Sequence, residues 1–442
     1  MVNRILFWLV LTGLVFANDQ IPGPPQSVPI LLRGGYLHTV SGPDLADFDI
    51  LFIDGKITAI DRNLEAFPNY EIHDIRGRHV YPGLIAASTT LGLVEIAAVR
   101  ATSDYAETGD LNPNIIANRA YNTDSESIPV TRSNGILLAH VTPQSGLIGG
   151  QSSLMMLDGW SWEDATLIES VGMHVFWPSI KYQKKNSDSK KKEDPVAEAE
   201  ARIAEISKLL SDARAYQRAL QAEKSGRRIK QQPRDLRLAS LQPVIAGRQP
   251  LFIHARSAIQ IEQAINWTRR EGLKMVLVGG HDLYPVMDLL GKYEIPVIIE
   301  SLQILPLHRH DHYDQVFSLP VALHQAGIRF AISGSASAFE APHQRNLPFE
   351  AAQALPFGLP RDMALRSITL SAAEILGAEE RIGSLEVGKD ATLIVTDGDI
   401  LEISTQVIKA WIQGRRVDLD NRHEQLYRKY REKYRQLGEL SD

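Results

Sequence analysis

Short apolar runs that alternate with polar residues fill the stretch 30–81. They read ILLRGGYLHTV, DILFIDGKITAID and YEIHDIRGRHVYPG, and Asp54-Gly55 is a favourable hairpin turn. The stretch 386–419 repeats the pattern in ATLIVTDGDI and VIKAWIQGRRVDL. Alternation with a period of two indicates strands that bury one face. We therefore predict a composite β-sandwich domain built from both ends of the chain, 30–81 and 386–419.

The middle of the chain, 82–385, has a different pattern. Apolar runs of strand length, such as GILLAHVTP, PLFIHA, KMVLVGG, IPVIIES and IRFAISG, are followed by polar residues and then by helical patterns. This alternation predicts an α/β fold with a (β/α)8 TIM-like barrel, whose functional residues gather just after the carboxyl ends of the strands. The glycine-rich run GLIGGQSS, 146–153, lacks the lysine of a phosphate-binding loop, and we expect a tight βα turn there.

Two segments stand apart from the barrel pattern. A charged insertion, 182–248, contains KKNSDSKKKED and a long amphipathic helix pattern. Such a lysine run is ordinarily a solvated loop, and the alternative is a binding patch for an anionic partner. The last segment, 420–442, has Tyr427, Tyr430 and Tyr434 at helical spacing, with Arg and Lys between them. We expect a C-terminal helix that packs this face onto the body.

The first residues have the pattern of an export signal. Arg4 precedes an apolar run from Ile5 to Ala17, and polar Asn18 follows. The run is shorter than the roughly 20 apolar residues that a spanning helix needs. We therefore predict a cleaved signal peptide, 1–17, rather than an uncleaved membrane anchor. The mature protein is expected in the periplasm or outside the cell, without membrane association.

Composition excludes several classes of function. The chain has 442 residues and a formal net charge of -6 with both signs well mixed, which gives no electrostatic footprint for nucleic acid. It has no cysteine, which excludes a disulfide framework and a thiol nucleophile. The expected partner is a small-molecule substrate or ligand, and a homo-oligomer stays open.

Four stretches form a recognisable set: VYPGLIAASTTLGL at 80–93, IHA at 253–255, GGHD at 279–282, and LSAAEILGAEERIGSLEVGKDATLIVTDGD at 370–399. Together they resemble the amidohydrolase superfamily, particularly its imidazolonepropionase-like branch. The resemblance implies a distorted (β/α)8 barrel with a composite β-sandwich. It also implies a hydrolase of carbon–nitrogen bonds other than peptide bonds, in which one or two divalent metals, usually zinc, activate water at the barrel mouth.

The resemblance assigns metal ligands to positions that this chain fills only in part. Ser88 and Thr90 stand where the family has His-x-His, and Ser335 stands at the expected aspartate after the last strand. His254 and His281 match the histidines that follow strands five and six. Hydroxyl groups are poor zinc ligands, and catalytic zinc normally has three protein ligands. We therefore expect a degenerate site with too few ligands to hold zinc firmly, and no other cofactor.

Other polar groups could form a site without the inherited ligands. Glu300 ends the run IPVIIE, and Arg256 lies two residues after His254 on the same side of its strand. They could act as general base and oxyanion clamp in metal-free hydrolysis, or form an internal salt bridge.

In LPLHRHDHYDQ, His308, His310 and His312 alternate, with Asp311 and Asp314 among them. If this segment is extended, the three imidazoles share a face and could bind a transition metal, and an exposed loop is the alternative. Lys181 could be a bridging lysine of the family, with a surface position as the alternative. The remaining polar candidates at strand ends and on the rim are Glu95, Gln144, Asp282, His343 and Arg345.

Two functions stay open at this point. By descent, the chain is a hydrolase of cyclic amides or dipeptide-like small compounds. By its missing ligands, it is a catalytically inactive relative that binds a small ligand or a protein partner at the barrel mouth. The two hypotheses differ in the metal content that they predict.

Overall fold

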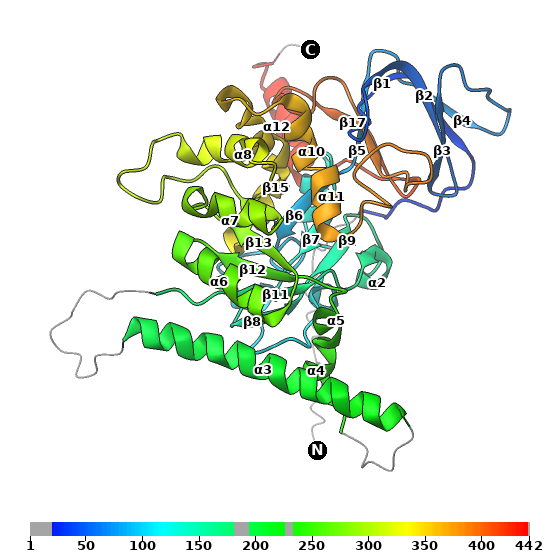
Figure 1. The fold of residues 1–442 in the computed structure, drawn as a ribbon. Coiled ribbons are helices and arrows are strands. Elements are labelled where there is room, and N and C mark those ends of the chain that lie inside the picture. Colours follow the sequence, from blue (N-terminus) through cyan, green and yellow to red (C-terminus); the bar gives the residue numbers. More distant parts are fainter. Residues whose placement is uncertain (1–19, 181–193, 226–232, 441–442) are drawn as a thin grey trace, which may run out of the picture.

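The computed structural model describes residues 20–180, 194–225 and 233–440, so the predicted signal peptide, Lys181 and most of the lysine run lie outside the described residues. The described strands form three sheets, of eight, four and six strands (Figure 1). None of the described helices is long and apolar enough to cross a bilayer.

The eight-stranded sheet combines both ends of the described chain. Its order is β18-β17-β16-β5-β1-β2-β3, with β4 paired to β1. Figure 1 shows the blue strands β1 to β4 beside the orange β17. The sheet encloses its own apolar cluster, in which Phe52 and Trp411 pack with ring centroids 5.7 Å apart. The strands are β1 (Ile30–Leu37), β2 (Leu45–Ile53), β3 (Lys56–Asp61), β4 (Glu71–Asp74), β5 (His79–Pro82), β16 (Leu393–Thr396), β17 (Val407–Ile412) and β18 (Arg415–Arg416).

The other two sheets form the barrel wall. Their orders are β10-β9-β7-β6 and β15-β14-β13-β12-β11-β8. Neighbouring strands from β11 to β15 are parallel, as are β6 and β7, so their carboxyl ends face one side. The strands are β6 (Leu84–Thr89), β7 (Ile136–Val141), β8 (Ile148–Gln151), β9 (Ser153–Met156), β10 (Thr166–Ile168), β11 (Met173–Phe176), β12 (Leu251–Ala255), β13 (Met275–Gly279), β14 (Val297–Glu300) and β15 (Phe330–Ser333).

The segment 148–156 corrects one prediction. The glycine-rich run was expected to be a tight turn, but it forms strands β8 and β9, which run antiparallel to β11 and β7. At Gly150, where φ is +128°, an added Cβ would lie 2.9 Å from the Ile115 carbonyl oxygen. Glycine here permits a close approach of two backbones rather than a turn.

Helices cover the barrel wall. They are α1 (Ser127–Arg132), α2 (Trp162–Ala165), α3 (Pro195–Lys224), α4 (Leu236–Ser240), α5 (Gln242–Ile245), α6 (Ala258–Glu271), α7 (Met287–Lys292), α8 (Gln315–Gln325), α9 (Leu347–Ala352), α10 (Arg361–Ser367), α11 (Leu370–Leu376) and α12 (Arg422–Gln436). Short 3-10 turns are η1 (Arg100–Thr102), η2 (Ala117–Ala120), η3 (Tyr284–Val286), η4 (Ala338–Asn346) and η5 (Leu355–Phe357). Ser257 and Gln260 form a capping box that fixes the start of α6 directly after β12.

The insertion contributes the long helix α3, which lies across one end of the molecule (Figure 1). Asp194 caps its first turn, and Pro195 occupies the position where a missing N–H costs nothing. Its buried face includes Ile206 and Leu210, and Ser207 accepts a hydrogen bond of 2.8 Å from the indole of Trp267 on α6. The helix is therefore held against the barrel by packing and by this polar contact.

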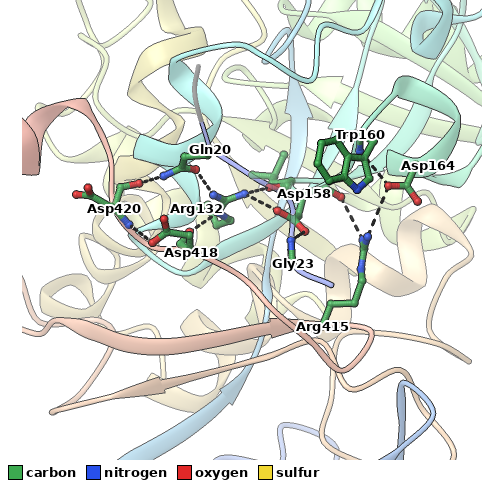
Figure 2. A network of polar contacts seen from close by, with 10 residues as sticks. Gln20, Gly23, Arg132, Asp158, Trp160, Asp164, Arg415, Asp418 and Asp420 are labelled. Carbon is green, nitrogen blue, oxygen red and sulfur yellow. Dashed lines mark hydrogen bonds and ion pairs between the residues drawn. The ribbon is translucent and has the colours of Figure 1, made fainter. Parts of the chain in front are cut away.

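A buried ion pair ties the first described residues to the body (Figure 2). Arg132, at the end of α1, lies 3.0 Å from Asp158, and the two residues are 3% and 6% exposed. The Arg132 guanidinium also donates to the Asp418 carbonyl at 2.9 Å and to the Gln20 side chain. Asp158 accepts from the Gly23 N–H at 3.0 Å. The pair thus joins both ends of the described chain to the barrel.

The C-terminal helix α12 corrects a second prediction. Its tyrosines were expected to pack onto the body, but no residue of α12 is buried. Tyr427, Tyr430 and Tyr434 are 60%, 49% and 42% exposed. Helical spacing indicated correctly that the three rings share a face, but that face points to solvent.

Candidate functional site

Side chains from strands that are not neighbours meet inside the barrel wall. The ring of His140 on β7 lies 5.0 Å from the ring of Phe252 on β12, although other strands separate β7 from β12. Such contacts are feasible only on the concave side of the wall, so Phe252 points inward. Because side chains alternate along a strand, His254 points inward as well.

His140 is fully buried and has both ring nitrogens occupied. Its Nδ1 lies 2.7 Å from the Ala87 carbonyl oxygen, and its Nε2 lies 2.7 Å from the Ser152 hydroxyl. Since a carbonyl oxygen only accepts, Nδ1 carries the proton and Nε2 accepts from Ser152. Burial lowers the pKa of His140 to about 4. The imidazole is therefore neutral at pH 7 and braces strands β6, β7 and the 148–156 segment.

His254 pairs with a second buried histidine. Its Nε2 lies 2.9 Å from Nδ1 of His174 on β11, and its ring stacks on Phe176 with centroids 4.2 Å apart. Burial lowers the pKa of His254 to about 3 and holds the pKa of His174 well below its usual value. His174 Nε2 is buried without a hydrogen-bond partner. The Nε2 nitrogen of His254 is thus occupied by another imidazole.

Arg256 and His281 follow strands β12 and β13, and Glu300 ends the neighbouring strand β14. His281 Nε2 donates to the Glu300 carbonyl oxygen at 2.6 Å, so its ring is turned toward β14. Burial raises the pKa of the Glu300 carboxyl, and the charge of Arg256 acts in the opposite direction. Burial also lowers the pKa of His281. Arg256 is exposed and directly follows the carboxyl end of β12.

Hydroxyl groups occupy the inherited ligand positions. Ser333 ends β15 in register with Glu300, and its Oγ accepts from the Ser88 N–H at 2.9 Å and donates to the Ser88 carbonyl at 3.1 Å. This bridge joins the outer strands of the two barrel sheets. Thr90 Oγ1 donates to the Ser337 carbonyl at 3.4 Å, and Ser335 Oγ accepts from the Ser337 N–H at 3.2 Å.

The donor set does not fit a catalytic zinc ion. His254 and His281 use their Nε2 atoms for other hydrogen bonds. The neutral Ser333 hydroxyl is hydrogen-bonded to the Ser88 backbone. Among the described residues, no group of three or more His, Cys, Asp or Glu side chains has the spacing to hold a metal ion. Zinc needs imidazole, thiolate or carboxylate ligands at about 2.0–2.3 Å. No step of a reaction is therefore routed through such an ion here.

The histidine-rich segment does not form a cluster of three imidazoles. His308 and His310 stack with centroids 5.2 Å apart, and His308 Nε2 lies 3.5 Å from Asp282. The segment forms turns rather than the extended strand that would align its histidines on one face. The other rim candidates make local contacts: Glu95 with Asn122, Gln144 with Thr142, His343 with Glu340, Arg345 with the Pro342 carbonyl, Asp311 with the His308 N–H, and Asp314 at the start of α8.

Sequence reasoning missed His140 and His174. Both lie in apolar runs that were correctly predicted as strands, GILLAHVTP and GMHVFWPSI. The signal that could have found them is position: each histidine stands one or two residues before the end of a short strand whose end lies at the barrel mouth. A histidine there is flanked by other strands and can meet their polar groups.

Comparisons with known proteins agree with this geometry. Residues 357–418 match the sequence profile of the amidohydrolase family. The chain is 21% identical over 400 residues to amidohydrolase tasK of Hapsidospora irregularis, which covers 83% of this chain and 39% of tasK. The chain thus spans about two fifths of the length of that curated relative.

Solved structures show the same fold. An amidohydrolase from Thermotoga maritima MSB8 superposes with a TM-score of 0.76 at 23% identity, covering 88% of this chain and 99% of that one. A prolidase complexed with N-methylphosphonate-L-proline superposes with a TM-score of 0.54 at 16% identity, again covering 88% and 99%. At these identities the likeness establishes the fold.

The barrel and the sheet built from both chain ends define an α/β protein with a TIM-like barrel and a composite β-sandwich, and the predicted fold class is confirmed. The resemblance to the amidohydrolase superfamily is confirmed as well.

Proposed function

We propose that this chain is a relative of hydrolases that act on carbon–nitrogen bonds other than peptide bonds, and that it binds a small cyclic-amide or dipeptide-like ligand at the barrel mouth without a catalytic zinc. The observation that carries the proposal is the bridge between Ser333 Oγ and the Ser88 backbone, at the level where the resemblance places metal ligands. Both serines are almost fully buried, so the bridge is part of the wall.

The mouth offers groups that recognise amides and carboxylates. Arg256 presents an exposed guanidinium, which binds carboxylate oxygens with two parallel hydrogen bonds. Burial raises the pKa of Glu300 and so favours its protonated form, which can donate a hydrogen bond to an amide carbonyl. The prolidase relative carries a proline derivative in its complex, which supports a dipeptide-like ligand. The predicted export signal, 1–17, supports a periplasmic or secreted location.

Metal-free hydrolysis at the same mouth is the second candidate. It is favoured by the contact of His281 with the Glu300 carbonyl oxygen and by the positive charge of Arg256, which acts on both side chains. A carboxyl group with a raised pKa is suited to act as a general acid, and a guanidinium can stabilise developing negative charge on the attacked carbonyl oxygen.

The test is calorimetric titration of chelator-treated protein with a panel of cyclic dipeptides and Xaa-Pro dipeptides, followed by an amine-release assay. Arg256→Gln should abolish binding, whereas the control Arg270→Gln, an exposed arginine on α6, should not. Binding without turnover supports the first proposal. Turnover that is lost in Glu300→Gln supports the second. Turnover that depends on added zinc would refute both, and a panel that shows no binding at all would refute the substrate class.

A further inference from the structure

The helix α12 carries a line of exposed tyrosine side chains. With 3.6 residues per turn, Tyr427, Tyr430 and Tyr434 form one stripe along the helix. The same stripe continues to Leu437, which follows the helix and is 59% exposed. In the part of the chain that the structure describes, no residue of α12 is buried. The helix therefore presents aromatic rings to solvent from Tyr427 to Tyr434.

Basic side chains line both edges of this tyrosine stripe. Lys429 and Lys433 lie along one edge, and Arg431 and Arg435 lie along the other, because each pair is four residues apart. All four side chains are exposed. The helix contains six Arg or Lys residues and two Glu residues, so it carries +4 in a chain whose formal net charge is -6.

The polar contacts of the other side of the helix lie within the C-terminal segment. Glu432 and Gln425 are partly buried and lie away from the tyrosine stripe. Arg428 donates two hydrogen bonds to the Asp420 carboxylate, at 2.9 and 2.7 Å, and Asn421 caps the first turn by accepting from the His423 and Glu424 N–H groups. The helix thus has a fixed start, and its tyrosine stripe is exposed.

We propose that α12 docks the protein on an anionic phospholipid surface. Tyrosine prefers the boundary between water and lipid because its ring is apolar and its hydroxyl is polar. Lysine and arginine beside an apolar stripe are attracted to acidic headgroups, and helices of this kind lie in the plane of the interface. The proposal modifies the expectation of no membrane association, because it predicts peripheral binding without a spanning helix. It does not depend on the proposed function of the barrel.

A second copy of the chain fits this face less well. A two-fold contact between two α12 helices would set two helices of charge +4 against each other. A stripe of three tyrosines and one leucine is also narrow for the roughly 1,200 Å² that a stable protein interface buries. An interfacial helix, in contrast, needs only one apolar face and basic flanks.

The experiment uses the full mature protein and flotation with vesicles of phosphatidylcholine alone or phosphatidylcholine with phosphatidylglycerol. We expect binding only to the mixed vesicles, weakened by salt. Lys429→Gln with Lys433→Gln should lower the partition coefficient about 30-fold, since each basic residue near an acidic surface contributes about 1 kcal/mol. Tyr430→Ser with Tyr434→Ser should weaken binding even at low salt.

The matched control is Arg218→Gln with Arg270→Gln, two exposed arginines on α3 and α6. Figure 1 shows α3 at the end of the molecule opposite α12, so this variant loses the same charge far from the proposed surface. It should bind as the wild type does. Equal binding to both vesicle types, or equal loss in the control, would overturn the proposal. Self-association in sedimentation that the tyrosine variant abolishes, without vesicle binding, would assign the face to a second copy instead.

Discussion

Replacing Arg132 with methionine tests the account of how the chain ends are held to the barrel. Methionine keeps much of the length of the side chain but removes every N–H donor. The change leaves the Asp158 carboxylate buried beside an apolar group and leaves the Leu157 and Asp418 carbonyls, now bonded at 2.7 and 2.9 Å, without this donor. Figure 2 shows Asp158 and Asp418 beside the guanidinium.

The expected cost follows from burial. Breaking a buried ion pair by removing one partner destabilises a protein by about 3–5 kcal/mol, because the remaining charge is uncompensated. Among the described residues, Asp158 then keeps the Gly23 N–H at 3.0 Å as a direct donor to its carboxylate, and the charge of Arg415 still acts on it. We therefore expect Arg132→Met to lower the free energy of unfolding by about 4 kcal/mol.

The assay is urea unfolding followed by circular dichroism, with Arg132→Met, Asp158→Asn and the double variant in one cycle. The double variant should be less destabilised than the sum of the singles, by about 2 kcal/mol, since it leaves no unpaired charge. The matched control is Arg76→Met, which breaks an exposed pair with Asp74 whose side chains are 75% and 55% exposed. A loss for Arg132→Met within about 1 kcal/mol, the range of surface pairs, would refute the reasoning.

Two further predictions concern titration inside the barrel. Burial lowers the pKa of His140 from 6.5 to about 4, so the unfolded chain binds this proton more tightly. The contribution of His140 to the free energy of unfolding is therefore complete above pH 6.5. It decreases by about 1.4 kcal/mol per pH unit as the pH drops toward 4. Urea midpoints between pH 7 and 4 measure the slope, and an unchanged slope in His140→Gln would contradict the assignment. Burial raises the pKa of the Glu300 carboxyl in the folded state. The free energy of unfolding therefore decreases as the pH rises through the folded-state pKa, because the buried carboxyl becomes charged. Glu300→Gln should raise the urea midpoint more at pH 8 than at pH 5, and a lower midpoint at both values would show that the ionised carboxylate stabilises the fold.

The sequence predicted the barrel strands well because apolar runs such as IPVIIE and IRFAISG leave little alternative to buried strands. It failed at Gly150, because glycine serves both turns and close backbone contacts, and only the partner segment decides between them. It failed at Tyr427 and its neighbours for a related reason. Helical spacing defines a face, but it does not say what covers that face.

The candidate site shows the same limit. The resemblance assigned His254 and His281 to the ends of particular strands, but it did not identify their hydrogen-bond partners. The partner of His254 lies 80 positions away in the sequence, and the partner of His281 lies 19 positions away. The pairing of His254 with His174 depends on the register of β11 against β12, which periodicity does not determine. The sequence did identify Ser88 as a position without a metal ligand, and the structure places the Ser333 hydroxyl against its backbone.

The most direct test of the central claim is the metal content of protein purified without chelator and then dialysed against buffer containing zinc. We expect that zinc does not remain bound, because hydroxyl and backbone groups fill the places of the missing ligands. Retention of one or two equivalents of zinc that His254→Ala removes would contradict it.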